Sequence, residues 1–417
     1  MASLDSMGED CLYLNIWKAN DGAEKKPVIV WIHGGAYEAG GTGMELFNCH
    51  KFIKENPDVI IVTVAYRLCV LGFLHLKHLP DGKDYPDAQN LGIMDQAMAL
   101  KWVHENIAGF GGDPDNVTIW GESAGAGSVT VLPLVKGTQQ YFKKVIAQSG
   151  TPTLTRSTEQ AIQCTNELMD ALGCKTVADL LKVSAEKLME ASAILRLRIS
   201  PERDGDFLPL NPYEAYANGA AKNISFLQGC NNHEFDFFVE VLGVEDFRQW
   251  APGRTAERLS ALTADQKALV ESYLQDIKGE EPYSCLFDQM WFNAPVIRMS
   301  EDQTKGGGKS YTYFLDKRQH GVELALVFNH LDLVPGLFEE PFAKTMRKMW
   351  LQFVKTGNPS LSADISPDGK AKEWPPYDLE NKQVMFLSET GIRPEKETDL
   401  KITDRERTYF LTDYYVF

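Results

Sequence analysis

The segment Gly121-Glu122-Ser123-Ala124-Gly125 places a serine between two glycines, directly after a short apolar run. That run, Val117–Trp120, is an expected strand, and small residues that can open a helix follow the pentapeptide. In a strand–turn–helix of this kind, glycines permit a sharp turn that lifts the serine hydroxyl above a sheet and in front of a helix N-terminus. The pattern predicts that Ser123 is a nucleophile. The alternative is a plain tight turn.

A serine nucleophile needs a base and an acid, which follow it in the order serine, carboxylate, histidine at sites of this type. Of the two histidines beyond Glu234, His320 lies in a polar segment after an expected strand, where an imidazole can reach the edge of a sheet. His330 follows the apolar run Leu324–Phe328 and suits packing or capping. Glu234, shortly after the expected strand Ser225–Gln228, is the candidate acid. Its alternative is a carboxylate that favours a helix N-terminus.

A second glycine-containing segment, Trp31-Ile32-His33-Gly34-Gly35-Ala36-Tyr37, follows another apolar run. Glycines after a buried strand allow backbone N–H groups to converge on the oxyanion that develops during acyl transfer. A simple glycine turn is the alternative. The oxyanion interpretation is favoured because this segment and the serine segment occur in one chain in the expected order.

The elements that must position these residues alternate between strand and helix patterns, which predicts an α/β fold with a mostly parallel sheet and helices on both faces. The expected strands are Pro27–His33, Val59–Tyr66, Val117–Trp120, Lys144–Gln148, Ser225–Gln228, Ser310–Leu315 and Val384–Leu387. Two further segments, Ile93–Asn106 and Phe342–Lys355, carry a helical apolar stripe. The whole chain, residues 1–417, is expected to be one domain.

The middle of the chain is mostly helical in pattern, over Ser157–Glu202 and Glu245–Ser300. A helical insertion within residues 157–300 is expected to form a cap over the carboxyl ends of the strands, where ligands bind in such sheets. Aromatic residues cluster there, and most are expected in the core, with the remainder lining an acyl or alcohol pocket. They are Phe237, Phe238, Trp250, Phe287, Trp291 and Phe292.

Composition narrows the class of protein. The 417 residues are 44% hydrophobic and 24% charged, as in globular proteins with a sizeable core. The formal net charge of −16 disfavours nucleic-acid binding, and no apolar run is long enough to predict a membrane span. The N-terminal residues lack the pattern of a signal peptide, and seven cysteines without zinc-type spacing favour free thiols in the cytoplasm. A Cys164–Cys174 disulfide is the alternative.

Taken together, the motifs resemble the type-B carboxylesterase (carboxylesterase/cholinesterase) family of α/β-hydrolases. Glu9-Asp10-Cys11-Leu12-Tyr13-Leu14-Asn15-Ile16-Trp17 is similar to that family's second signature, and Gly121–Gly127 is similar to its serine signature. The resemblance extends from about Glu9 to the C-terminal region. Further blocks in the family's order are Tyr66-Arg67 with Leu71–Leu74, Asn90–Gln96 and Phe110–Pro114.

The resemblance implies a Ser123–Glu234–His320 triad. Its acid lies in a block that begins at Gly229, and its base lies in the block His320-Gly321-Val322-Glu323. The backbone N–H groups of three residues would form the oxyanion hole, although the family more often has glycine at the second of them. These residues are Gly35, Ala36 and Ala124.

Further roles follow from the same resemblance. Arg67 and Asp95 match a structural ion pair. Glu122, Ser149 and Glu323 fall where the family has polar residues behind the triad. Family members usually have a longer segment before Glu9, which includes one wall of the active-site gorge and a partner for the cysteine at position 11. Cys11 is therefore expected to be a free thiol, and choline esters are not implied.

The expected activity is hydrolysis of uncharged carboxylic esters, with short to medium acyl or aryl groups, without a metal or organic cofactor. Two alternatives stay open at this point. One is a member that lacks catalysis, or is weakened by its short N-terminus, and acts as a binding protein. The other is a hydrolase of a related acyl bond, such as a carbamate, lactone or thioester. The oligomeric state is left open.

Overall fold

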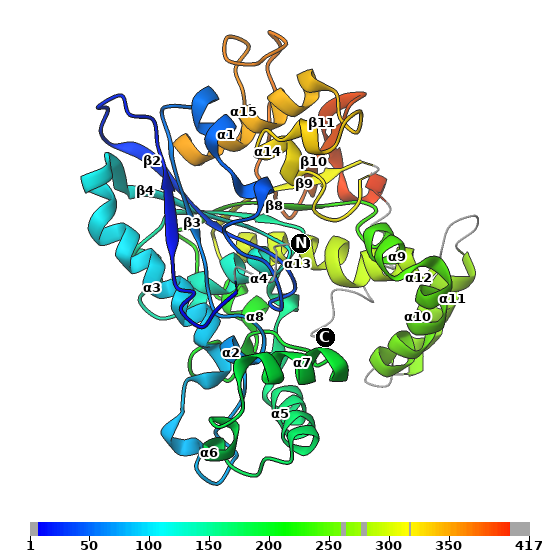
Figure 1. Cartoon of the computed structure of the whole chain (residues 1–417). Coiled ribbons are helices and arrows are strands. Elements are labelled where there is room, and N and C mark those ends of the chain that lie inside the picture. Colours follow the sequence, from blue (N-terminus) through cyan, green and yellow to red (C-terminus); the bar gives the residue numbers. More distant parts are fainter. Residues whose placement is uncertain (1–6, 260–263, 277–281, 317, 401–417) are drawn as a thin grey trace. The chain divides into compact units, whose positions relative to one another are not determined.

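The computed structural model describes residues 7–259, 264–276, 282–316 and 318–400 (Figure 1). They fall into two compact units. The first contains the chain up to Ile146 together with Leu154–Ala215. The second contains Ala147–Thr153 and the chain from Tyr216 onward. The segment of Ser123 belongs to the first unit, and the segments of Glu234 and His320 belong to the second.

The first unit is built on a largely parallel sheet. Strand β2 pairs in parallel with β3 on one side and with β4 on the other, so that Val28 lies opposite Ile60 and Val117. Strand β1 adds to β3 in antiparallel orientation. Neighbouring strands follow in the order β1 (Leu14–Trp17), β3 (Ile60–Val64), β2 (Lys26–Ile32), β4 (Gly112–Glu122) and β5 (Lys144–Gln148), the last of which ends in the second unit.

The remaining elements of the first unit surround or follow this sheet. Helix α5 begins with a capping box, in which Ser157 and Gln160 each bond the other's backbone N–H. Strands β6 (Arg156–Ser157) and β7 (Glu202–Arg203) form a separate parallel pair. The helices are α1 (His50–Glu55), α2 (Cys69–Gly72), α3 (Leu91–Asn106), α4 (Ala124–Val131), α5 (Thr158–Leu172), α6 (Val177–Leu180), α7 (Ala185–Leu195) and α8 (Pro212–Ala217), which ends at the start of the second unit.

The second unit contains strands β8 (Ser225–Asn231), β9 (Lys309–Leu315), β10 (Gln383–Ser388) and β11 (Gly391–Lys396) in that spatial order. The β8–β9 and β9–β10 pairs are parallel, and β11 is an antiparallel edge strand. Helices α9 to α12 pack together around an aromatic core (Figure 1). The helices are α9 (Asp236–Leu242), α10 (Val244–Leu259), α11 (Ala264–Asp276), α12 (Pro282–Asp288), α13 (Ala294–Lys305), α14 (Leu324–Val327) and α15 (Glu340–Thr356).

The expectation of mostly parallel strands is confirmed, and each expected strand overlaps an observed one. The sequence pattern misses the antiparallel strands β1 and β11 and the short parallel pair of β6 and β7. Strand β11 contains a proline and charged residues, which are typical of an edge strand and carry no apolar run. The expected strand Val117–Trp120 is only part of β4, because β4 begins in polar residues at Gly112.

The expected ion pair between Arg67 and Asp95 is present. The guanidinium donates to both carboxylate oxygens, at 2.8 Å from Nε and 2.6 Å from Nη2, and the Arg67 backbone N–H adds a third hydrogen bond of 3.0 Å. The Asp95 side chain is only 7% exposed. The pair therefore fixes the chain after β3 to helix α3.

No helix among the described residues is both long enough and apolar enough to cross a membrane. All seven cysteines are free, so Cys164 and Cys174 are not joined in this structure. Cys11 is also a free, partly exposed thiol.

We predict that Asp95→Ala lowers the free energy of unfolding by about 2–3 kcal/mol, because it leaves a bidentate arginine without its carboxylate. The value lies at or below the usual range for buried pairs because one third of the Arg67 side chain is exposed. The change in the free energy of unfolding is measured by urea denaturation. Lys101→Ala is the control, since it breaks the exposed Lys101–Glu105 pair on the same helix and should leave stability unchanged. Equal effects of the two substitutions would contradict the prediction.

Candidate active site

Ser123 stands at a strained turn between β4 and α4. Its backbone has φ 55° and ψ −124°, a conformation that side-chain-bearing residues rarely adopt. The flanking glycines are required by close backbone contacts. A Cβ on Gly125 would lie 2.0 Å from the carbonyl oxygen of Ile32, and one on Gly121 would lie 2.3 Å from the backbone of Gly125. The sequence motif is thus a sharp elbow with the serine at its tip.

The second glycine segment packs directly against this elbow. A Cβ on Gly34 would lie 3.0 Å from the Cβ of Ser123 and 2.9 Å from Oε2 of the buried Glu122. Three consecutive residues after it, Gly35, Ala36 and Tyr37, have positive φ values of 106°, 56° and 62°. Successive backbone N–H groups in a turn can converge on one side and form an anion-binding concavity.

Ala124 supplies a further N–H group. It is the first residue of α4, and the N–H groups of a first helical turn have no partner within the helix. Ala124 itself is buried. The three expected oxyanion residues are therefore found in the first unit, two in the strained turn and one at the helix start.

The strained turn is held by buried polar contacts. His33 Nδ1 lies 2.8 Å from the carbonyl oxygen of Gly34, and the hydroxyl of Tyr66 donates to the His33 carbonyl at 2.8 Å. Burial lowers the pKa of His33 to about 4, so the imidazole is neutral at pH 7. Since a carbonyl can only accept, the hydrogen of that neutral ring is on Nδ1.

In the second unit Glu234 and His320 form a direct pair. His320 Nδ1 lies 2.7 Å from Glu234 Oε2. The carboxylate is fully buried, and its other oxygen accepts from the Ser149 hydroxyl at 2.5 Å and from the Asn231 N–H at 2.6 Å. A carboxylate on Nδ1 selects the tautomer whose Nε2 carries the free lone pair, which a general base requires.

A second carboxyl group, Glu323, lies behind this pair. It is fully buried and accepts from Gln148 Nε2 at 3.0 Å and from Asn231 Nδ2 at 2.7 Å. Burial and the neighbouring charge of Glu234 together raise the pKa of Glu323 to about 7, although the hydrogen bond from Asn231 lowers it. Gln148 is itself held by Trp350 of α15, whose indole N–H donates to Gln148 Oε1 at 3.2 Å.

Aromatic rings surround the imidazole of His320. The ring centroids of Phe292, Phe238 and Phe237 lie 5.1, 5.3 and 6.2 Å from it. Phe292 is buried in the aromatic core, whereas Phe237 is 38% exposed. Of the six aromatics singled out in the sequence, Phe237 alone is exposed. His330 is buried, as expected for a packing residue.

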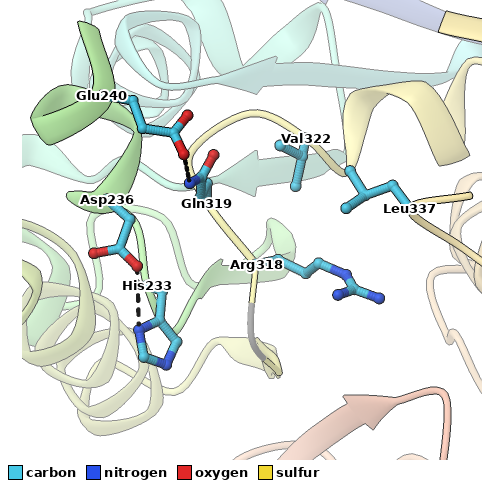
Figure 2. Close-up of a pocket in the computed structure, with 7 residues that line it drawn as sticks. All are labelled: His233, Asp236, Glu240, Arg318, Gln319, Val322 and Leu337. Atoms are coloured by element: carbon cyan, nitrogen blue, oxygen red, sulfur yellow. Dashed lines mark hydrogen bonds and ion pairs between the residues drawn. The ribbon is translucent and has the colours of Figure 1, made fainter. Parts of the chain in front are cut away.

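A hollow of about 680 Å³ lies beside the segments of Glu234 and His320 without including either residue (Figure 2). Its acidic residues pair locally: Asp236 lies 3.6 Å from His233, and Glu240 accepts from Gln319 at 2.9 Å. Figure 2 shows the acidic residues on one side and Arg318 on the other. The lining residues are His233, Asp236, Glu240, Arg318, Gln319, Val322 and Leu337.

The structure thus places the candidate residues in two constellations, each within one unit. Ser123, Glu122 and the three oxyanion residues form the first, and Glu234, His320, Ser149 and Glu323 form the second. Sequence reasoning missed two residues that bind the second constellation, Gln148 and Asn231. Each is the last residue of a strand, β5 or β8, and a polar residue at the end of a buried strand is the signal that could have identified it.

Solved structures place the fold in the α/β-hydrolase class. A carboxylesterase from Geobacillus stearothermophilus matches with a TM-score of 0.82 and 33% identity, over 96% of this chain and 85% of that one. A solved PNB esterase matches with a TM-score of 0.78 and 30% identity, over 97% and 86%. Residues 1–403 match the Carboxylesterase family. The chain belongs to this family.

Relatives by sequence agree. Para-nitrobenzyl esterase of Bacillus subtilis (strain 168) is 32% identical over 95% of this chain and 83% of its own length. Carboxylesterase 1C of Mus musculus is 30% identical over 94% and 78%. Acetylcholinesterase of Bungarus fasciatus is 29% identical over 92% and 69%. The expected resemblance is confirmed, and the matched region covers most of the length of each relative.

We predict that Gly125→Ala prevents the elbow from forming, because the added methyl group would meet the Ile32 carbonyl at 2.0 Å. The protein should lose several kcal/mol of stability or accumulate as insoluble material. Thermal unfolding and soluble yield are the measurements. Gly109→Ala adds the same methyl group where no atom lies within 4 Å and should behave like the parent protein. A stable Gly125→Ala protein would show that the turn is looser than described.

Proposed function

We propose that this carboxylic ester hydrolase is a serine carboxylesterase that cleaves uncharged esters, with short to medium acyl or aryl groups, through an acyl-enzyme. The observation that carries the proposal is the 2.7 Å hydrogen bond between His320 and the buried Glu234, in a chain whose serine occupies a strained elbow. Membership of the carboxylesterase family supports it.

In the proposed reaction, His320 Nε2 takes the proton of Ser123 as the serine oxygen attacks the ester carbonyl carbon. Glu234 keeps the imidazole in the required tautomer and stabilises the imidazolium that forms. His320 then gives the proton to the departing alcohol, which leaves an acyl group on Ser123. In the second half, His320 takes a proton from water, and the resulting attack releases the carboxylic acid.

The proposed oxyanion hole consists of the N–H groups of Gly35, Ala36 and Ala124. Each such donor typically contributes about 3 kcal/mol to stabilising the tetrahedral intermediate. Alanine at position 36 donates its N–H as glycine would, and its positive φ of 56° is the strained value needed at this place in the turn. Ser149 supports the proposed acid through its hydrogen bond to Glu234, and Glu122 is buried next to Ser123 in the elbow.

The proposed discrimination against anionic esters rests on Glu38, which lies two residues after Ala36 in the same turn. Its N–H donates to the Gly35 carbonyl at 2.9 Å. Its carboxylate forms no ion pair with any Lys, Arg or His among the described residues, and partial burial raises its pKa. A carboxylate without a counterion, beside the proposed oxyanion hole, repels esters that carry a negative charge of their own.

We also propose a cytoplasmic location, because the seven cysteines are free thiols, including the partly exposed Cys11, Cys174 and Cys285. Free thiols persist in reducing compartments.

We predict that Ser123→Ala lowers kcat for p-nitrophenyl esters by at least about three decades while the protein still folds, since the nucleophile is lost. The assay covers acyl chains of different lengths, which also sizes the acyl pocket. Circular dichroism and thermal unfolding serve as the control for folding. Turnover that survives in Ser123→Ala would remove Ser123 from the mechanism. A well-folded parent protein without any turnover would instead favour the binding-protein alternative.

We predict that Glu38→Gln raises kcat/KM for anionic esters, such as monoesters of dicarboxylic acids, by about 5- to 30-fold, the order expected for removing one nearby unit charge at a protein surface. Values for neutral esters of the same size should stay constant. The matched control is Glu24→Gln, an identical charge change before the N-terminal end of β2, whereas Glu38 follows its C-terminal end. If both variants shift the anionic-to-neutral ratio equally, general charge and not Glu38 sets the preference.

A further inference from the structure

Asn231 occupies the junction between the two segments of the second constellation. It is the last residue of β8 and is completely buried. Its backbone N–H donates to Glu234 Oε1 at 2.6 Å. Its side-chain amide donates to the carbonyl oxygen of Gln319 at 2.6 Å and to Glu323 Oε2 at 2.7 Å. One residue therefore contacts the proposed acid and both sides of the turn that carries the proposed base.

The orientation of the Asn231 amide is determined by these partners. Both acceptors of Nδ2 are oxygens, one a carbonyl and one a carboxylate, so a flipped amide would place oxygen against oxygen. In the observed orientation both N–H bonds of the amide are used, while Oδ1 has no hydrogen-bond partner among the described residues. The Gln319 carbonyl and the Glu323 carboxylate therefore fix the orientation of the amide.

The two donations bracket His320 along the chain. Gln319 immediately precedes the histidine, and Glu323 follows it by three residues. With both points tied to the end of β8, the turn cannot move without breaking a buried hydrogen bond. Since Glu234 Oε1 is bound to the backbone of the same residue, the distance between Glu234 Oε2 and His320 Nδ1 is set through Asn231.

We propose that Asn231 is a positioning residue for the acid–base pair, which fixes the His320 turn against Glu234 through its bonds to Gln319 and Glu323. This inference rests on the proposed function. Asn231 contacts neither the proposed nucleophile nor the proposed oxyanion residues among its described hydrogen bonds. It acts through Glu234, His320 and Glu323.

The charge of Glu323 provides a readout that is specific to this role. Burial and the neighbouring Glu234 charge raise the pKa of Glu323, the Asn231 amide hydrogen bond lowers it, and the net value is about 7. Without the amide, Glu323 stays protonated to higher pH. Two neighbouring charged groups also shift the pKa of Glu323: Glu234 raises it and His320 lowers it. In the parent protein Glu323 is partly ionised near pH 7, and the ionised fraction favours the imidazolium. When Glu323 stays neutral through this range, the acid limb of the kcat/KM profile moves to lower pH.

The experiment compares Asn231→Leu with the parent protein in p-nitrophenyl ester hydrolysis across pH 5–9, a range set by the reference pKa values of histidine and carboxyl groups. We expect kcat to fall by about 10- to 100-fold with KM changed by less than about twofold, as for a misplaced catalytic group. The acid limb should move to lower pH. In a Glu323→Gln background, Asn231→Leu should leave the acid limb where it is, because the titrating carboxyl is absent.

Gln228→Met is the matched control. Gln228 is also a buried amide on β8, and its Nε2 donates to Ser300 and Ser310, away from Glu234 and the His320 turn. Gln228→Met should lower thermal stability without moving the acid limb. It should not lower kcat selectively while KM stays constant. If Asn231→Leu does not fold, Asn231→Ser removes the same amide with less bulk and is tested in the same way.

Asn231 variants that match Gln228→Met, with lower stability but an unchanged acid limb and kcat, would overturn the inference and leave the proposed function intact. Failure of the proposed function has a different signature. In that case the folded parent protein hydrolyses no ester, or Ser123→Ala retains full activity. Both results are obtained without any Asn231 variant.

Discussion

The constraint on which the second constellation depends is a carboxylate, Glu234, completely removed from water without an arginine or lysine partner in the described contacts. Burying an unpaired charge is costly, and the cost is offset here by charge-assisted hydrogen bonds. A hydroxyl, a backbone N–H and an imidazole supply them, from Ser149, Asn231 and His320. Each donor comes from a different segment of the chain, so the carboxylate fixes all three at once. The geometry that a general base needs is a consequence of this electrostatic requirement.

The first constellation depends on a different constraint, which is a strained backbone conformation. Ser123, Ala36 and Tyr37 all hold positive φ values, and such conformations persist only where surrounding contacts determine them. The determining contacts are close backbone approaches at the neighbouring glycines and the buried hydrogen bonds of His33 and Tyr66. One constellation is thus maintained by packing against backbone and the other by charge. The two respond to different kinds of substitution.

The sequence predicted those parts of the fold and site that have a local signature. Buried parallel strands appear as apolar runs, and the elbow appears as glycines around Ser123. Contacts between segments distant in the chain leave no such signature. Asn231 meets Gln319 across 88 positions and Gln148 meets Glu323 across 175, so neither role could be predicted from spacing. The sequence pattern did not identify edge strand β11, because its side chains are at most partly buried. The direct Glu234–His320 contact likewise required the structure, although the family resemblance had named both residues.

The buried imidazole of His33 has a consequence for acid tolerance. Its pKa in the folded protein is about 4, below the ordinary value of 6.5. Between those values an unfolded chain binds a proton at this position and the folded chain does not. Protons therefore favour the unfolded state, and the stability supplied by the neutral ring is complete above pH 6.5 and declines as the pH falls toward 4. A histidine with no part in the proposed chemistry thus helps to set the lowest pH at which the turn behind Ser123 keeps its shape.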